Sequence, residues 1–349
     1  MDLMERIARL TAAPGATGLE EGVAAEALRQ LQAMGAEAWQ DRAGNIFGRV
    51  GAGGPTVLLM AHMDEIGMAV AAIEENGMLR LCKIAGVDPR ILPGSRLVVE
   101  GREGPLWAVA GATPPHLQKK EEVPPAYAWE DILCDTGLEA AKVRALVRVG
   151  DPVTLAPEPP LALLDGRVAG KTLDDRAPLA ALLALFEGLC AAPPPCTAVL
   201  CASCQEEKSG AGAMAAARSA KPDMALAVDV CHAPPPKAPF RAFPLEDLVL
   251  CRSASLHPGL YGLVEAAARS AGVSYQVEAA MAASGTDAWD IAVQNGGVAT
   301  GLLSVPLRYM HTGVEVVSLS ALASLEKTLE AFLGGLGDAA WKEALCWND

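Results

Sequence analysis

The order of helix-like and strand-like segments constrains the fold of this chain more than any single residue does. Apolar positions recur at helical spacing in residues 2–12 and 18–34, and short apolar runs typical of strands follow, the last at residues 56–60. Helical spacing then fades between residues 68 and 164, where short β-like runs are separated by Gly and Pro. This stretch therefore predicts an all-β module inserted into a different kind of domain.

The alternation of helices and strands resumes at Asp165. The expected elements are helices at 177–190, 260–270 and 319–333, and strands at 196–203, 224–230 and 298–305. Alternating elements of this kind predict a parallel or mixed sheet covered by helices on both faces. We therefore expect an α/β domain formed by residues 1–67 together with 165–349, with residues 68–164 as the insertion.

The overall composition narrows the class of protein. A chain of 349 residues with 51% hydrophobic and 20% charged residues is long and apolar enough to form a compact fold with two domains. Its formal net charge of −14, with no basic cluster, argues against nucleic acid and anionic membranes as partners.

Localisation is predicted from the N-terminus and the cysteines. Residues 1–7 lack a basic region followed by an apolar core, and no apolar run is long enough to span a bilayer. The nine cysteines have no regular spacing, which is typical of reduced thiols. We expect a cytoplasmic protein.

A polar pair follows directly after the apolar run at residues 56–60. His62 and Asp64 are separated by one residue, so on an extended chain their side chains point to the same side. An imidazole can bind a metal ion while the neighbouring carboxylate fixes its orientation. A surface-exposed strand end with ordinary polar residues is the alternative interpretation.

Further polar residues fall near the ends of other predicted elements. These are Asp174 and Asp175 before a helix, Glu206 and Glu207 after a strand, Asp229 at a strand end, and His311 shortly after a strand. In open α/β sheets ligands bind beyond the carboxyl ends of the strands, so these residues are expected to converge. Two imidazoles and several carboxylates form a ligand set for a pair of Zn²⁺-like ions, one carboxylate bridging both.

Each of these residues also has an ordinary structural interpretation. Asp174 could cap a helix, the adjacent glutamates could be solvated, Asp229 could close a turn, and His311 could be an interior histidine. Their joint placement near element ends favours the metal site. For the remaining candidates, packing is expected of Cys201 and Cys204, loop roles of His116 and His257, and a supporting donor role of His232.

Taken in order, these segments resemble the glutamyl aminopeptidase family of di-metal peptidases, the TET-type aminopeptidases, some of which are labelled endoglucanases. The resemblance covers nearly the whole chain. Its motifs are Ala61–Gly67, Gly170–Arg176, Gln205-Glu206-Glu207, Ala227–Ala233, Gly285–Ala288 and Arg308–Thr312, with weaker support from Val147–Val153.

The resemblance implies a role for each candidate residue. His62, Asp229, Glu207 and His311 would be metal ligands, with Asp174 bridging the two ions and a cis peptide joining it to Asp175. Glu206 would be the general base and Asp64 the partner of His62. The ions would be Zn²⁺ or Co²⁺, with Mn²⁺ also accepted by such ligands.

The resemblance also implies how the chain acts and assembles. Short peptides would lose their N-terminal residues, and the barrel-like insertion would form dimers that build a hollow tetrahedral dodecamer. The chain departs from the family at residues 208–212 and in the Pro-rich stretch after His232, which affects the substrate pocket. Two alternatives remain: a shell-forming homologue without activity, and a glycoside hydrolase using Glu206 with another carboxylate.

Overall fold

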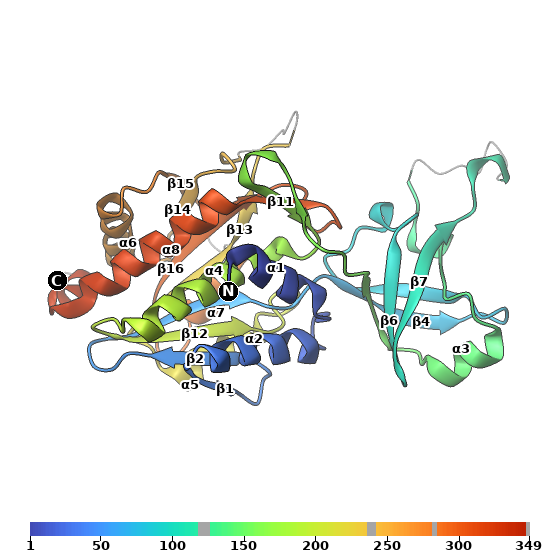
Figure 1. Cartoon of the computed structure of the whole chain (residues 1–349), viewed down its shortest axis with the longest axis horizontal. Coiled ribbons are helices and arrows are strands. Elements are labelled where there is room, and N and C mark those ends of the chain that lie inside the picture. The colour runs from blue at the N-terminus through green and yellow to red at the C-terminus, as the bar shows by residue number, and fades with distance from the viewer. Residues whose placement is uncertain (118–125, 236–241, 281–284, 347–349) are drawn as a thin grey trace.

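The computed structural model describes residues 1–117, 126–235, 242–280 and 285–346. Figure 1 shows a large sheet with its helices at one end of the molecule and a small barrel at the other. The predicted fold class, a mixed-sheet α/β domain with an inserted barrel-like β module, is confirmed.

The large sheet has eight strands in the order β1-β2-β12-β3-β13-β16-β14-β15. Its centre consists of four mutually parallel strands: β12 (Thr197–Ser203), β3 (Thr56–His62), β13 (Met224–His232) and β16 (Ala299–Leu307). The flanking strands are β1 (Glu37–Gln40), β2 (Ile46–Val50), β14 (Leu248–Arg252) and β15 (Tyr275–Ala279). Because the central strands are parallel, their carboxyl ends meet at one edge, where ligands bind in sheets of this kind.

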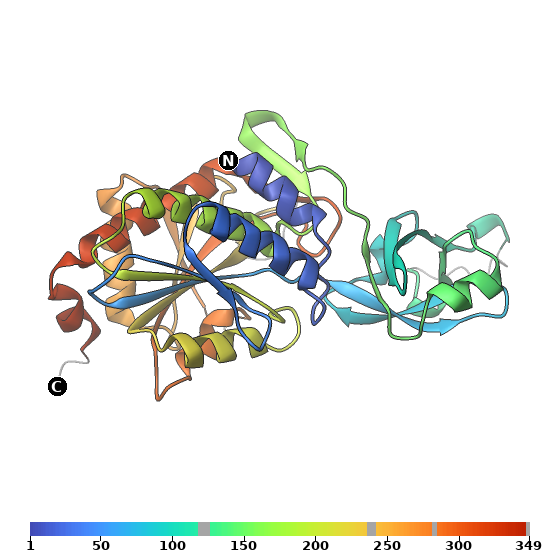
Figure 2. The same ribbon diagram turned by 60° about the horizontal axis from the view of Figure 1, so that its bottom comes forward.

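Helices cover both faces of this sheet, as Figure 2 shows. Alternate strand residues pack on opposite sides, so that Leu59 and Leu226 contact one layer of helices while Met60 and Ala227 contact the other. The first layer contains α1 (Leu3–Ala12), α2 (Glu21–Ala33), α4 (Leu173–Ala191), α6 (Pro258–Ser270) and α8 (Leu319–Gly334). The second layer contains α5 (Ala211–Ala220) and α7 (Asp287–Ala292). A short helix, α9 (Ala340–Leu345), packs against α6.

The inserted module is a closed antiparallel barrel in the order β4-β5-β8-β7-β6-β9. Its strands are β4 (Gly67–Ile73), β5 (Leu79–Ala85), β6 (Arg96–Gly101), β7 (Gly104–Ala112), β8 (Ile132–Asp135) and β9 (Pro152–Leu155). The barrel has its own apolar core and one short helix, α3 (Ala140–Leu146), within an otherwise β-type stretch. A small sheet of β10 (Leu161–Ala162), β11 (Arg167–Gly170) and β17 (Glu315–Ser318) follows the return of the chain.

The predicted helices and strands outside the barrel are present, with ends shifted by a few residues. Helix α4 begins at Leu173, ahead of the predicted residue 177, so that Asp174 and Asp175 lie in its first turn. The sequence reasoning did not identify α5, α7, β14, β15 or β17. Residues 236–241, in the Pro-rich stretch after His232, lie outside the described residues.

Within the described part of the chain, no helix combines the length and apolar character needed to span a membrane.

Candidate metal centre

The carboxyl ends of the central strands bring the predicted site residues together. His62 is the last residue of β3, and Asp229 lies on the neighbouring strand β13. The pairing of these two strands stops at Met60 and Ala227, two residues before the polar side chains. The crevice between the strands opens at that point, as expected for a binding site in a parallel sheet. Glu206 and Glu207 follow β12, and His311 follows β16, at the same edge.

Asp174 lies between the two histidines. Its Oδ1 atom is 3.1 Å from His62 Nε2, and its Oδ2 atom is 3.3 Å from His311 Nε2. His311 Nε2 is also 3.3 Å from Glu207 Oε1. One carboxylate thus has an oxygen directed at each imidazole, which is the arrangement a bridging ligand needs. The peptide between Asp174 and Asp175 is cis, as the resemblance implied.

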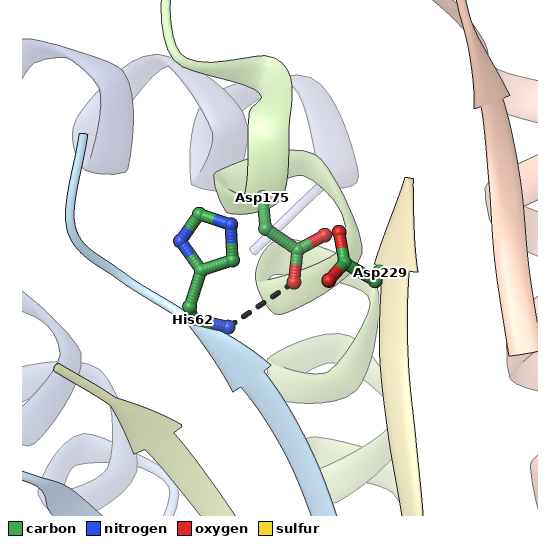
Figure 3. Close-up of side chains that lie close together, drawn as sticks. All are labelled: His62, Asp175 and Asp229. Carbon is green, nitrogen blue, oxygen red and sulfur yellow. Dashed lines mark hydrogen bonds between the residues drawn. The ribbon is translucent and has the colours of Figure 1, made fainter. Parts of the chain in front are cut away.

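Two overlapping groups of donor atoms have the spacing of metal ligands. One contains His62, Asp175 and Asp229, and the other contains His62, Asp174 and Glu207, each with its donor atoms within 4.8 Å of one another. Figure 3 shows the carboxylates of Asp175 and Asp229 facing each other beside His62. Asp175 Oδ2 accepts a hydrogen bond from the backbone N–H of His62 at 3.1 Å. The sequence predicts Asp175 near the site beside Asp174, but the resemblance gave it no ligand role.

Asp64 joins His62 to the loop that carries the two glutamates. Its Oδ1 atom lies 3.4 Å from His62 Nδ1, which is also 3.2 Å from the Asp64 carbonyl oxygen. The carboxylate of Asp64 accepts hydrogen bonds from the backbone N–H groups of Glu206 and Glu207 at 3.1 and 3.2 Å, and from the hydroxyl of Thr17 at 2.9 Å. These bonds hold the Glu206 side chain next to the imidazole, with Glu206 Oε2 3.8 Å from His62 Nε2.

Glu315 is a site residue that the sequence did not reveal. It is buried at the start of β17, and its two oxygens accept hydrogen bonds from the backbone N–H groups of Asp174, at 3.1 Å, and His311, at 2.8 Å. It therefore fixes the relative positions of two candidate ligands from distant parts of the chain. The available signal was an acidic residue opening an otherwise apolar strand, Glu315-Val316-Val317-Ser318.

Asp287 is a second residue without an assigned role, although its motif contributed to the resemblance. It opens α7, is buried, and accepts a hydrogen bond from the hydroxyl of Ser203 at 2.5 Å. The other carboxylate oxygen of Asp287, like Asp175 Oδ1, has no hydrogen-bond partner within the described residues. Buried oxygens left in this way are costly unless another group binds them.

A buried ion cluster holds the segment that follows His62. Glu65 forms ion pairs with Lys171 and with Arg176, the latter at 3.2 Å, and all three side chains are buried. Arg176 also donates hydrogen bonds to the carbonyls of Met63, at 3.0 Å, and Leu10, at 2.8 Å. The cluster therefore connects α1 and α4 to residues 63–66, the segment between β3 and the first barrel strand.

The titration of the site reflects crowded acid groups. Burial and neighbouring carboxylates raise the pKa of Glu206 to about 9, with His62 acting in the opposite direction. Burial, followed by the charge of Asp174 and Asp287, raises the pKa of Asp229 well above its usual value. For His311, burial lowers the pKa, but hydrogen bonds to Asp174 and Glu207 outweigh it and raise the value to about 10. Without cations, the site therefore holds protons that positive charge would displace.

The residues present fit divalent cations. Imidazole nitrogens and carboxylate oxygens at this spacing are the ligands that Zn²⁺, Co²⁺ and Mn²⁺ accept. The adjoining cavity is lined by Asp174, Glu206, Glu207 and Asp229, and its described lining includes no Lys or Arg that would neutralise them. Bound cations would balance the negative charge of these carboxylates.

The other candidates from the sequence lie elsewhere or at the margin. Cys201 and Cys204 are buried free thiols that pack in the apolar cores, as expected. His257 caps α6 by accepting a hydrogen bond from the N–H of Leu260, and His116 lies in a short 3-10 turn beyond β7. His232 lines the cavity at the end of β13.

Known proteins with the same architecture and sequence pattern place the chain in a family. Residues 44–328 match the M42 glutamyl aminopeptidase family. The lysyl aminopeptidase of Pyrococcus furiosus is 29% identical over 335 residues, covering 94% of this chain and 96% of the relative. The glutamyl aminopeptidase of Lactococcus lactis subsp. cremoris is 28% identical over 346 residues, covering 96% and 97%.

Solved structures agree with these sequence relationships. A TET aminopeptidase from a marine sediment archaeon of the Thaumarchaeota superposes with a TM-score of 0.90 at 25% identity, with 99% of each chain covered. The TET1 peptidase of Pyrococcus horikoshii, described as assembling into a tetrahedron or a large octahedral shell, superposes with a TM-score of 0.85 at 29% identity, covering 95% of this chain and 99% of its own. The chain belongs to the M42 glutamyl aminopeptidase family.

Proposed function

We propose that this protein is a di-metal aminopeptidase that removes N-terminal residues from short peptides. The observation that carries the proposal is the position of Asp174, with one oxygen directed at His62 and the other at His311. A single-metal site needs no carboxylate shared between two imidazoles.

In this proposal the candidate ligands divide into two sets that share Asp174, which contacts His62 on one side and His311 on the other. His62 and Asp229 would complete one set, while Glu207 and His311, which contact each other, would complete the other. Two Zn²⁺ or Co²⁺ ions, or Mn²⁺, held there would lower the pKa of a coordinated water and polarise the peptide carbonyl. Asp64 keeps the imidazole of His62 oriented through its contact with Nδ1.

Glu206 is the group placed to move protons. Its carboxylate is largely buried beside His62, and its loop is fixed by the hydrogen bonds to Asp64. Nearby positive charge favours the ionised carboxylate, which accepts a proton from the attacking water. Glu206 then returns that proton to the leaving amine as the peptide bond breaks. The neutral amide of glutamine has the same shape but cannot accept the proton.

Replacing the base tests the mechanism. Glu206→Gln should keep its bound metal yet lose turnover of aminoacyl anilides by roughly 10²–10⁴-fold, the usual contribution of a general base. Near wild-type rates in the metal-loaded variant would remove Glu206 from this role. Metal-stripped wild-type protein should be inactive until Zn²⁺, Co²⁺ or Mn²⁺ is restored.

The same assay separates the alternatives. β-Glucan hydrolysis that persists in chelator would favour a glycoside hydrolase, and we expect none. Tight metal binding without hydrolysis of any aminoacyl anilide would instead favour a shell-forming homologue that has lost activity.

We further propose that the barrel joins copies of this chain into dimers and larger shells. Trp107 and Val109 on β7 are 60% and 51% exposed, and they lie two residues apart on the same face of the strand. Such a patch on a barrel suits contact with a second copy. Light scattering should give a mass of several chains, and Trp107→Glu should shift that mass toward the monomer.

A further inference from the structure

The cavity beside the candidate ligands extends away from them across one face of the sheet. It has a volume of about 420 Å³ and runs from Asp229 over Leu302 and Ser304 to Glu278. Leu302 packs in the core on the α5/α7 side of the sheet, so this is the face that the cavity follows. The cavity therefore has a metal-binding end and a second end formed by the edge strand β15.

Strand register fixes how far apart the two ends lie. Asp229 on β13 is level with Ser304 on β16, and Ser304 is level with Val249 on β14. Glu278 on the next strand, β15, pairs with Cys251, which lies two residues after Val249 on β14. Neighbouring strands are about 4.8 Å apart and each residue rises about 3.3 Å, so Asp229 and Glu278 are separated by roughly 14 Å across the sheet and about 7 Å along it. The Glu278 side chain closes part of this distance, and a long substrate side chain suits the rest.

Glu278 has a carboxylate that no side chain among the described residues neutralises. It is half-buried, and its carboxylate has neither a hydrogen bond nor an ion pair within the described residues. Burial raises the pKa of the Cys251 thiol to about 11, and the charge of Glu278 adds to that shift, which shows that the carboxylate lies near β14. The described lining of the cavity contains no Lys or Arg.

The floor between the two ends is less polar than the ends themselves. Leu302 and Cys231 lie there, and the small residues Ser304 and Ala280 leave room above them. A methylene chain packs favourably on such a surface while its charged head reaches beyond it. This combination of an apolar floor and an unpaired carboxylate suits a long cationic side chain.

We propose that Glu278 selects peptides whose N-terminal residue is Lys or Arg. The α-amine binds at the metal-binding end, the aliphatic stem lies over Leu302 and Cys231, and the side-chain cation pairs with Glu278. An acidic N-terminal residue would meet a carboxylate instead and is disfavoured. This inference rests on the proposed aminopeptidase function, and it names the substrate of the same site.

The experiment compares lysyl, arginyl, methionyl and glutamyl anilides with metal-saturated protein. Lysine and methionine have unbranched side chains of similar length, so the ratio of their kcat/KM values isolates the contribution of the charge. We expect the lysyl substrate to exceed the methionyl one by roughly 10-fold, mainly through KM, because a hydrogen bond to a charged group has about that effect. Glu278→Gln should bring the ratio close to one, and Glu278→Lys should favour the glutamyl substrate over the lysyl one.

Glu330→Gln is the matched control, because Glu330 is exposed on α8, which packs on the other face of the sheet. It should keep the wild-type ratio. Added salt should lower the lysyl preference of the wild-type protein, a test that needs no variant to fold.

Turnover of the anilide panel distinguishes a wrong selectivity from a wrong aminopeptidase function. Equal turnover of lysyl and methionyl substrates, or an unchanged ratio in Glu278→Gln, would overturn the selectivity and leave the aminopeptidase intact. Absence of turnover with every anilide would overturn the aminopeptidase and, with it, the selectivity.

Discussion

Removing the charge of Glu65 should destabilise the protein more than removing either of the cations that it neutralises. Glu65, Lys171 and Arg176 are 1%, 6% and 0% exposed, so none of them is solvated to a useful extent. Glu65→Gln keeps the shape of the side chain but leaves two buried cations without their common counter-ion. Breaking a buried ion pair from one side costs about 3–5 kcal/mol.

The effect on the melting temperature follows from the size of the α/β domain. A loss of 1 kcal/mol lowers the Tm of a domain of about 250 residues by about 2 °C, and of a smaller one by up to about 4 °C. Glu65→Gln should therefore lower Tm by roughly 6–10 °C, measured by calorimetry at saturating Zn²⁺. Burial already lowers the pKa of Lys171, so the loss should shrink as pH rises and this lysine gives up its proton.

Lys171→Met is the matched variant, because it removes one buried cation and leaves the pair of Glu65 with Arg176 at 3.2 Å. We expect it to cost less than Glu65→Gln, and we expect the double variant to be more stable than Glu65→Gln alone. A loss below about 1 kcal/mol for Glu65→Gln would show that water or a rearrangement solvates the cations. A larger loss for Lys171→Met would refute the assignment of Glu65 as the common counter-ion.

Three further predictions concern the site. The raised pKa values of His311, about 10, and Glu206, about 9, mean that the folded metal-free protein binds protons more tightly than the unfolded chain. Its stability should therefore fall as pH rises, from about 4.5 to 9 through Glu206 and from about 6.5 to 10 through His311. Calorimetry should show this fall in chelator and a flatter profile with Zn²⁺, whereas a Tm that rises over this range in chelator would contradict it. Glu315→Gln leaves one of the two backbone N–H groups, of Asp174 or His311, without an acceptor. It should therefore lower the free energy of unfolding by roughly 1–3 kcal/mol, measured with denaturant, and should also lower kcat. An unchanged kcat would show that Glu315 does not position the ligands. At Gly86, where φ is +62°, a β-carbon would lie 2.0 Å from Ile66 Cγ2 and 3.2 Å from His311 Nδ1, so Gly86→Ala should displace His311 and weaken metal retention in dialysis. Gly94→Ala is the control: its φ is +91° but the space around it is open, so this variant should lower stability without affecting metal retention.

The sequence predicts the candidate metal-centre residues because they fall near the ends of apolar elements: most lie at or after the end of a buried central strand, and Asp174 lies at the start of the buried helix α4. The runs before His62 and Glu206 are strands β3 and β12, and their parallel pairing makes a shared edge from segments far apart along the chain. The positions were predictable from pattern alone. The distances between the side chains were not, because they depend on loop geometry such as the left-handed backbone of Gln205 and His311.

The elements that sequence reasoning missed are those whose residues give little contrast between faces. Helix α5 (Ala211–Ala220) is largely alanine, so its buried and exposed sides look alike, and α7 has only 6 residues. Strand β15 is half-buried at the edge of the sheet and alternates weakly, which hid Glu278. Glu315 was missed because a buried acidic residue is recognisable only from the backbone groups that it contacts, and those belong to distant segments.

Anomalous diffraction from crystals of the stripped protein reloaded with Zn²⁺ would locate the bound ions. We expect two peaks, about 3.5–4 Å apart, on either side of the Asp174 carboxylate, one near His62 and Asp229 and the other near Glu207 and His311. A single peak, or peaks away from Asp174, would contradict this expectation.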